Sequence, residues 1–193
     1  MPRVEVFDRA QVLEKVKHLF WDKGFHGTSM QDLVDVTGLN RSSLYNSFGN
    51  KKALYDLVLK DYQAESRTFL KGAIADAENP LEAIELIFKT LIRSIYEDVE
   101  GKGCFLMNCT TEMSRSDEDL KNFLVHGSEG MIELFEDIIK EGQISGDINT
   151  EQTAKDYALY LYSSFQGIRI TGVLITDKTK LNQIVKNTIH ILS

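Results

Sequence analysis

Residues 24–50 are the part of the chain that most restricts its fold. Gly24, Gly38 and Gly49 can each end a helix, and Asn40 and Asn50 are residue types that favour the position just before a helix starts. Only two short helices fit between these stops. A longer helical segment precedes them, so the pattern predicts a helix-turn-helix.

The apolar spacing supports that prediction. Residues 9–23 carry Val12, Leu13, Val16, Leu19 and Phe20 on one helical face. Thr28 followed by Gln31 is a capping-box pattern that predicts the start of the first short helix. Asn40 is expected to cap a second one over residues 41–48, with Leu44 and Phe48 facing the core.

Cations stand where two of the predicted helices begin. Arg41 lies in the first turn of one helix, and Lys51 and Lys52 lie in the first turn of the next. A helix start carries partial positive charge, so a cation there costs ~0.3 to 1 kcal/mol. Single exposed cations tolerate that cost. Two neighbouring helix starts with hydroxyls and a tyrosine between them instead favour a polyanionic partner.

Residues 9–55 resemble the DNA-binding domain of the TetR family of one-component bacterial regulators. The family pattern runs from a helix ending in F…KGF/Y, through TS/T…I/L…G, to S-L-Y-x-x-F-x-x-K-x-x-L. This chain has LFWDKGFHGTSMQDLVDVTGLNRSSLYNSFGNKKALY, with each spacing kept. It departs from the family at Val34 and Thr37, where Ala is usual, at Asn40, where Ser is common, and at Ser42, where Gly is common.

The resemblance implies roles for individual residues at a double-stranded DNA operator. Phosphate contacts fix the register and base-edge contacts carry sequence information, so Arg41 can pair with a guanine and Asn46 with an adenine. Ser43 can instead pack inside. The residues expected at phosphates are Thr28, Tyr45 and Lys51, those expected in the major groove are Arg41, Ser42, Ser43 and Asn46, and Ser29 and Lys52 complete the expected DNA-binding set.

The rest of the chain is predicted to be all-α, because it has long periodic segments and the chain has only two prolines. We expect an N-terminal three-helix helix-turn-helix DNA-binding domain over residues 1–49 and a C-terminal helical ligand-sensing and dimerisation domain over residues 50–193. The helices predicted in the second domain cover residues 50–77, a segment starting at Asn79-Pro80, residues 104–113, a segment capped by Ser116 and ending near 141, residues 149–175 and residues 178–192.

Charge is unevenly distributed. The formal net charge of the chain is -7. Residues 1–54 contain 8 Lys and Arg and 6 Asp and Glu, whereas residues 55–193 contain 14 and 23. The acidic excess therefore lies away from the proposed DNA face, where it limits nonspecific binding. No apolar run is long enough to span a bilayer and the first ten residues lack a leader's apolar stretch, so we expect a cytoplasmic protein with no membrane contact.

Broad apolar faces on the last two predicted helices are typical of a subunit contact, although part of them must form intramolecular core. The resemblance implies a homodimer whose last two helices form a four-helix bundle across a twofold axis. Two DNA-reading helices ~34 to 36 Å apart then meet successive major grooves of a pseudo-palindrome. The residues expected at the interface are Tyr157, Leu161, Phe165, Leu181, Ile184, Val185 and Thr188.

The resemblance also implies a small-molecule effector that binds among the central helices and moves the helix of residues 50–77. Aromatic and Met side chains with a few polar groups are the mixture that ligand pockets favour, although most such residues form core. The candidates are Phe69, Phe88, Ile92, Met107, Asn108, Thr111, Tyr162 and Gln166. No cluster of charges among them specifies the ligand.

Cys104 and Cys109 are the only cysteines. Five residues apart on a helix they point about 140° away from each other, so an internal disulfide would require unwinding. Buried packing thiols are one reading. A thiol-based redox or electrophile sensor is the other, with Lys102 as the only nearby cation that can lower a thiol pKa.

No sequence feature indicates an enzyme. The chain has no HExxH, no glycine-rich phosphate loop, no G-x-S-x-G and no CxxC, and its four histidines show no metal-ligand spacing. We therefore expect no catalytic residue, metal or cofactor. The sequence predicts a ligand-responsive transcriptional regulator, most simply a repressor. The alternatives are a thiol-sensing repressor and a helical small-molecule carrier that does not bind DNA.

Overall fold

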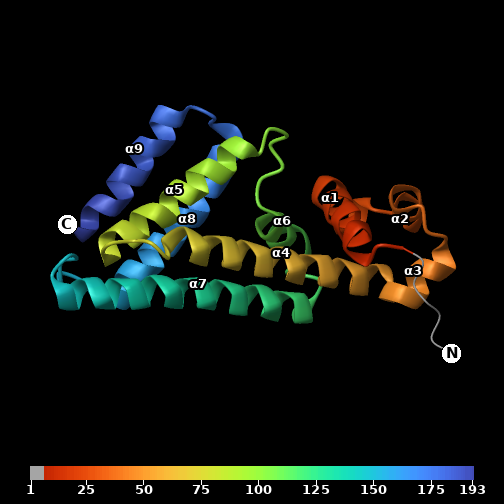
Figure 1. Ribbon diagram of the computed structural model, residues 1–193, viewed down its shortest axis with the longest axis horizontal. Coiled ribbons are helices and arrows are strands. Elements are labelled where there is room, and N and C mark those ends of the chain that lie inside the picture. Colours follow the sequence, from red (N-terminus) through yellow and green to blue (C-terminus); the bar gives the residue numbers. More distant parts are fainter. Residues whose placement is uncertain (1–6) are drawn as a thin grey trace. The chain divides into compact units, whose positions relative to one another are not determined.

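The computed structural model describes residues 7–193, and within this range the chain forms nine α-helices and no strand (Figure 1). The predicted all-α fold with an N-terminal helix-turn-helix is therefore confirmed. Residues 1–6, which form part of the segment examined for a leader, lie outside the described residues. Among the helices described, none is both long and apolar enough to cross a membrane.

Two compact units divide the chain. The N-terminal unit consists of the residues up to Glu65 together with Phe105–Lys121, and the C-terminal unit consists of Ser66–Cys104 and Asn122–Ser193. The boundary expected between residues 49 and 50 falls inside the N-terminal unit. As a division of function, it stays a prediction.

Short helices and one half of a long helix build the N-terminal unit. They are α1 (Arg9–Gly27), α2 (Met30–Thr37), α3 (Arg41–Phe48), the first part of α4 (Lys51–Ile74) and α6 (Phe105–Met113). Buried aromatic rings join them: Phe105 of α6 lies 5.6 Å from the ring of Tyr55 and 6.0 Å from that of Trp21. Because Phe105 is only 1% exposed, α6 supplies part of this unit's core although it is distant in sequence.

Longer helices build the C-terminal unit. They are the end of α4, α5 (Pro80–Glu97), most of α7 (Glu118–Ser145), α8 (Ala154–Leu174) and α9 (Lys178–Ile189), followed by the 3-10 turn η1 (His190–Leu192). Helices α5, α8 and α9 pack against one another (Figure 1). At the centre the rings of Phe88, Phe135 and Phe165 lie 5.9 to 6.3 Å apart.

Three predicted helix starts are confirmed. The side-chain oxygen of Asn40 accepts from the backbone N–H of Ser43 at 2.9 Å. Asn50 accepts from Ala53 at 2.8 Å, and Asn79 accepts from Glu82 at 2.9 Å. Each cap satisfies one of the N–H groups that a helix start leaves without a partner.

Two capping predictions are wrong by one residue. The first cap is Ser29, which forms a capping box with Asp32, and not Thr28 with Gln31. The hydroxyl of Thr28 instead donates back to the carbonyl oxygen of Gly24 at 2.7 Å. The second cap is Asp117, whose carboxylate accepts from Leu120 N–H at 2.9 Å, because the hydroxyl of Ser116 donates back to Met113.

The predicted start of α8 is also wrong. The helix begins at Ala154 with Thr153 as its cap, five residues after the predicted start at Asn149. Asn149 is used elsewhere: its amide donates to the carbonyl oxygens of Ile191 at 2.8 Å and Ser193 at 3.1 Å. These bonds tie the α7–α8 connection to the end of the chain and hold Asn149 outside the helix.

Candidate nucleic-acid interface

Helix α3 has one buried and one exposed face. Leu44 and Phe48 are 1% and 7% exposed and hold the helix in the core, as predicted from their spacing. At the end of α3, the guanidinium of Arg9 lies 4.5 Å over the Phe48 ring and donates to the carbonyl oxygen of Ser47 at 3.1 Å. The axis of α3 is therefore fixed from both its apolar side and its C-terminal end.

The opposite face of α3 presents Arg41, Ser42, Tyr45 and Asn46 to solvent. Ser43 is partly buried beside them. Within the part of the chain that the structure describes, the Arg41 side chain has no ion pair or hydrogen bond. Its cost at a helix start is therefore not offset by any of the residues described. This face carries a guanidinium, an amide and hydroxyls, the groups that pair with base edges and phosphates.

We call residues 25–29 the α1–α2 connection: they are the last turn of α1, after the kink at Gly24, and the two residues before α2. Thr28 is 1% exposed and its hydroxyl is already used by Gly24, so its side chain is not presented to solvent. Ser29 is exposed, and its hydroxyl and backbone N–H both bond to the carboxylate of Asp32. Of these two members of the expected DNA-binding set, the structure presents only Ser29 at the surface.

Lys51 is held by the same connection. Its ammonium donates to the carbonyl oxygens of Phe25 and Thr28, both at 2.7 Å, and lies 4.2 Å over the Phe25 ring. These contacts offset the cost of a cation at the start of α4. An ammonium has three N–H groups, so one remains for a phosphate.

Lys52 is used inside the protein. Its ammonium lies 2.7 Å from carboxylate oxygens of both Asp56 and Asp117. Burial alone would lower the pKa of Lys52, but hydrogen bonds to Asp117 and Asp56 raise it above its usual value. The Lys52 ammonium is therefore held by these two acids and not presented to a phosphate. The sequence pattern identified the cation but not its two acidic partners.

Sequence reasoning missed Glu112, which binds the α1–α2 connection from α6. Its carboxylate accepts from the backbone N–H of Phe25 at 3.0 Å and from that of His26 at 2.8 Å. Phe25 and His26 lie 87 and 86 residues before Glu112 in the chain. No local sequence pattern reports a contact at that separation, so only the fold could reveal it.

Comparison with known proteins accounts for both parts of the chain. Residues 12–58 match the family described as "Bacterial regulatory proteins, tetR family". Residues 80–188, more than half of the chain, match "Tetracyclin repressor-like, C-terminal domain". The chain belongs to the TetR family. The resemblance seen in residues 9–55 is thereby confirmed and extends through the C-terminal unit.

Two curated relatives match almost the full length of the chain. An uncharacterized HTH-type transcriptional regulator, YezE of Bacillus subtilis (strain 168), is 26% identical and covers 100% of both chains. The HTH-type transcriptional repressor ComR of Escherichia coli (strain K12) is 28% identical, covering 98% of this chain and 90% of its own. Both names describe regulators of transcription, and neither describes an enzyme.

A solved structure has the same fold. The TetR family transcriptional regulator CifR, as a cysteine mutant complexed with 26bp double-strand operator DNA, superimposes with a TM-score of 0.87 at 19% identity. The match covers 99% of this chain and 100% of the CifR chain. The TetR-family fold of the present chain therefore agrees with a protein seen on its operator.

Most residues expected at a TetR-family dimer interface are buried within the chain itself. Leu161 and Leu181 are 0% exposed, and the other buried members of the expected set are Tyr157, Phe165 and Thr188. Ile184 is 37% exposed and Val185 is partly buried. Five of the seven residues expected at the interface are therefore buried in the core of the chain itself. Periodicity identified the apolar positions but not which of them face outward.

A different set of apolar residues faces outward on α8 and α9. On α8 they include Tyr160 at 42% exposure, Ile170 at 54% and Leu174 at 82%. Ser163 and Gly167 are exposed at matching helical spacing between them, and a Cβ added at Gly167 would meet no atom within 4 Å. We call Tyr160, Ser163, Gly167, Ile170 and Leu174 the α8 seam.

The expected effector residues are dispersed. Phe88 and Ile92 are buried in the core of the C-terminal unit, whereas Phe69 is 54% exposed on α4. Met107, Asn108 and Thr111 lie on α6 in the N-terminal unit. Tyr162 and Gln166 are joined by side-chain hydrogen bonds: the Gln166 amide donates to the Tyr162 hydroxyl at 2.9 Å, and that hydroxyl donates to Ser128 at 2.7 Å.

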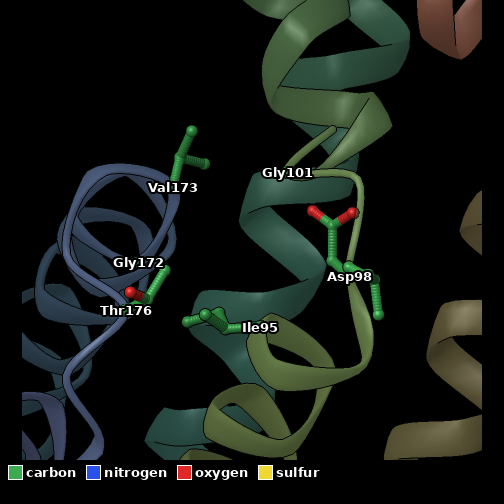
Figure 2. A pocket seen from close by; sticks show the side chains of 7 residues that line it. Ile95, Asp98, Gly101, Gly172, Val173 and Thr176 are labelled. Carbon is green, nitrogen blue, oxygen red and sulfur yellow. The ribbon is translucent and has the colours of Figure 1, made fainter.

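One hollow of about 100 Å³ lies in the C-terminal unit between the ends of α5 and α8 (Figure 2). Ile95, Asp98 and Val173 are among its lining residues, and none of the expected effector residues is. Ligand sites usually measure about 300 to 1,000 Å³, so this hollow is small for an effector. The effector residues stay a prediction.

Thiol sensing is not favoured. Cys109 is 0% exposed, and burial raises the pKa of its thiol to about 11. Burial likewise raises the pKa of the neighbouring Tyr55 hydroxyl. A reactive thiol needs the opposite, a lowered pKa and access to solvent. Both cysteines are reduced, and Cys104 lies just before α6 rather than on it, so the expected helical pair does not form.

Proposed function

We propose that the chain is a homodimeric TetR-family repressor that binds a pseudo-palindromic operator through α3 and is released by a small-molecule effector. One observation carries the proposal: Arg41 has no partner among the described residues, and it stands beside Asn46 on an exposed helix face whose opposite side is fixed by Leu44 and Phe48. A rigid helix bearing donors and acceptors is what the major groove accepts.

The contacts divide into two classes. Arg41 and Asn46 read base edges, with Ser42 and Ser43 beside them. Tyr45 and the third N–H of Lys51 bind phosphates, which set the position of α3 on the duplex, whereas both donors of Ser29 are held by Asp32. The buried hydroxyl of Thr28 and the twice-paired ammonium of Lys52 support these contacts without touching DNA.

The α8 seam is the contact between two copies in this proposal, with Ile184 of α9 beside it. Apolar side chains at the ends and small residues at the centre allow two helices to approach closely. A twofold axis through this face presents two α3 helices to successive major grooves, ~34 to 36 Å apart. Support comes from the exposure of these side chains and from the family of the chain.

The substitution Gly167→Glu tests the dimer contact. It places a charge at the centre of the seam where the free chain has open space, so the protomer should fold and sediment as a monomer. Gly72→Glu is the matched control, because Gly72 is an exposed helical glycine on α4 that also has open space around it. If the Gly167→Glu variant remains dimeric, the dimer interface does not lie at the α8 seam.

Tyr162, Gln166 and Ser128 are the proposed polar end of the effector site. The Oε1 atom of Gln166 is buried and has no hydrogen-bond partner among the described residues. A buried acceptor without a donor is costly, so a ligand that supplies an N–H or O–H there gains binding energy. This favours an effector with a hydrogen-bond donor.

Genome-fragment selection with the purified protein tests the proposal as a whole. The expected result is a pseudo-palindrome bound by a dimer, with affinity that falls steeply as salt rises because counterions are released. Weak, sequence-independent binding would have two sources, a retained effector or a carrier that does not bind operators. Repeating the selection with refolded, ligand-stripped protein separates them, since only a repressor then recovers an operator.

A further inference from the structure

We propose that Glu112 is a positioning residue for operator binding, through which α6 controls the placement of the DNA-binding helices. This inference rests on the proposed function and adds the route by which the C-terminal unit acts on the DNA contacts.

The carboxylate of Glu112 binds two successive peptide N–H groups. Oε2 accepts from Phe25 N–H at 3.0 Å and Oε1 accepts from His26 N–H at 2.8 Å. We call this pair of bonds the Glu112 clamp. Hydrogen bonds to a charged acceptor are about twice as strong as neutral ones, and two parallel bonds also fix orientation. The clamp therefore sets both the distance and the angle between α6 and the α1–α2 connection.

Gly24 makes room for the clamp. Its φ of 70° and ψ of 176° interrupt α1 just before Phe25. A Cβ at this position would stand 2.7 Å from Oε2 and 2.9 Å from Oε1 of Glu112. Only glycine combines this conformation with this space.

The same connection is bound from its carbonyl side by Lys51. The Phe25 N–H points to the Glu112 carboxylate, while the Phe25 carbonyl accepts from the Lys51 ammonium. Lys51, one of the proposed phosphate contacts, is thus attached to a segment whose other side is held by α6. A displacement of Glu112 moves the Lys51 ammonium relative to α3.

A second carboxylate of the same segment holds the start of α4. Asp117 bonds to Lys52 at 2.7 Å through one oxygen and caps α7 through the other. Lys52 directly follows Lys51 in the sequence. Residues 105–121 therefore hold the DNA-binding helices at two places, with Glu112 at one and Asp117 at the other.

The path of the chain makes this segment a means of transmission. Residues 105–121 belong to the N-terminal unit, whereas the residues on both sides of them belong to the C-terminal unit. A rearrangement of the C-terminal unit reaches α6 through two covalent connections, at 104–105 and at 121–122. The Glu112 clamp then transmits this rearrangement to the phosphate contacts, and α4 does not need to move.

The test compares Glu112→Gln with Glu118→Gln in the full-length dimer. Both variants remove one negative charge, but Glu118 is exposed on α7, where it is paired with Lys121 at 3.3 Å. Amide hydrogen exchange at Phe25 and His26 should become at least about tenfold faster in Glu112→Gln and stay unchanged in Glu118→Gln.

Operator titration at several salt concentrations gives the functional readout. Glu118→Gln should bind as tightly as the original chain or slightly more tightly, since it removes a charge that repels DNA. Glu112→Gln should bind at least about tenfold more weakly and with a shallower salt dependence, because displaced phosphate contacts release fewer counterions. A merely structural role would lower the folded fraction and leave the salt slope unchanged.

The outcomes separate this inference from the proposed function. Failure of the original chain to select any operator overturns the proposed function, while the exchange data still report on the clamp. Operator binding by Glu112→Gln that equals Glu118→Gln overturns the positioning role. If Glu112→Gln does not fold, Glu112→Asp replaces it: the charge is kept but the shorter side chain loses one of the two bonds. Unchanged exchange and affinity in Glu112→Asp would then overturn the inference.

Discussion

Both units of this protein have an aromatic core, but they differ in what is added to it. In the N-terminal unit, charged side chains bind named backbone groups: Glu112 holds two N–H groups and Lys51 holds two carbonyl oxygens. In the C-terminal unit, the centre is a cluster of aromatic and aliphatic side chains around Phe88 and Phe165. Directional bonds fix angles, whereas apolar packing fixes volume. The unit that contains the helix-turn-helix adds the directional kind to its aromatic core.

The largest effect expected from this contrast is at Phe88, which is 0% exposed. Phe88→Ala should reduce the free energy of unfolding by ~3 to 5 kcal/mol, because it removes apolar contacts and leaves a cavity. Phe69→Ala is the matched control at a side chain that is 54% exposed, and it should change the free energy by less than ~1 kcal/mol. Urea unfolding measures both, and similar losses would contradict the packing account.

A smaller effect is expected at Gly24 in the N-terminal unit. Gly24→Ala forces a side chain into a glycine-only conformation and against the Glu112 carboxylate, so it should cost ~3 kcal/mol. Gly38→Ala is the control, because Gly38 also has a positive φ but has nothing within 4 Å of an added Cβ. It should cost ~1 to 2 kcal/mol. Equal unfolding free energies of the two variants would show that the carboxylate moves aside freely.

The next comparison separates a cation that binds DNA from one that binds the protein. Arg41→Ala should weaken operator binding by ~1 to 3 kcal/mol, mainly at one base position, and leave the melting temperature unchanged. Lys52→Ala should instead lower the melting temperature, because Asp117 and Asp56 lose their partner.

Binding to cognate and single-base-substituted operators, together with thermal unfolding, measures both properties. Lys51→Ala provides the intermediate case, with equal weakening on all sequences and a salt slope reduced by about one phosphate. If Arg41→Ala weakened binding to all operator sequences equally, Arg41 would not contact a base.

The smallest effect concerns pH. The hydrogen bond from Lys52 lowers the pKa of Asp117 below its usual value. A carboxylate whose folded pKa lies below its unfolded pKa of ~3.9 stabilises the protein fully above about pH 5 and loses this contribution as the pH falls through the folded pKa. Asp117→Asn keeps the helix cap but loses the charge, so its stability should fall less on acidification.

Urea unfolding at neutral pH and near pH 3 measures that difference, which we expect to be at most ~1 kcal/mol at neutral pH because both side chains are partly exposed. Asp119→Asn, on the exposed first turn of α7, is the control for a general loss of charge. A stability difference between Asp117→Asn and the original chain that stays constant with pH would mean that the ion pair contributes nothing.

The sequence predicted local structure well where one residue decided the outcome. Asn40, Asn50 and Asn79 each start a helix as expected, because each is followed by the helix and has no competing partner. It failed by one residue where two candidate caps are adjacent. Thr28 and Ser116 donate backward to the preceding helix, which leaves the capping position to Ser29 and Asp117.

Non-local contacts explain the remaining differences. Cations at the start of α4 suggested DNA, yet Lys52 is paired with Asp56 and with Asp117, which is 65 residues further along the chain. On α8 apolar residues occur on both faces, so periodicity alone could not assign Leu161 to the core and Tyr160 to the surface. The exposed face of α3 needed no such information, and Arg41 and Asn46 lie where the pattern predicted.

The insertion of Phe105 into the N-terminal core limits how chimeric regulators can be built. A chimera that joins residues 1–65 to the sensor of another protein removes Phe105 from its contacts with the rings of Tyr55 and Trp21. It also removes Glu112 from the N–H groups of Phe25 and His26. A transplantable DNA-binding module from this chain therefore has two pieces, and residues 105–121 must be transferred with the helix-turn-helix for the new regulator to bind the original operator.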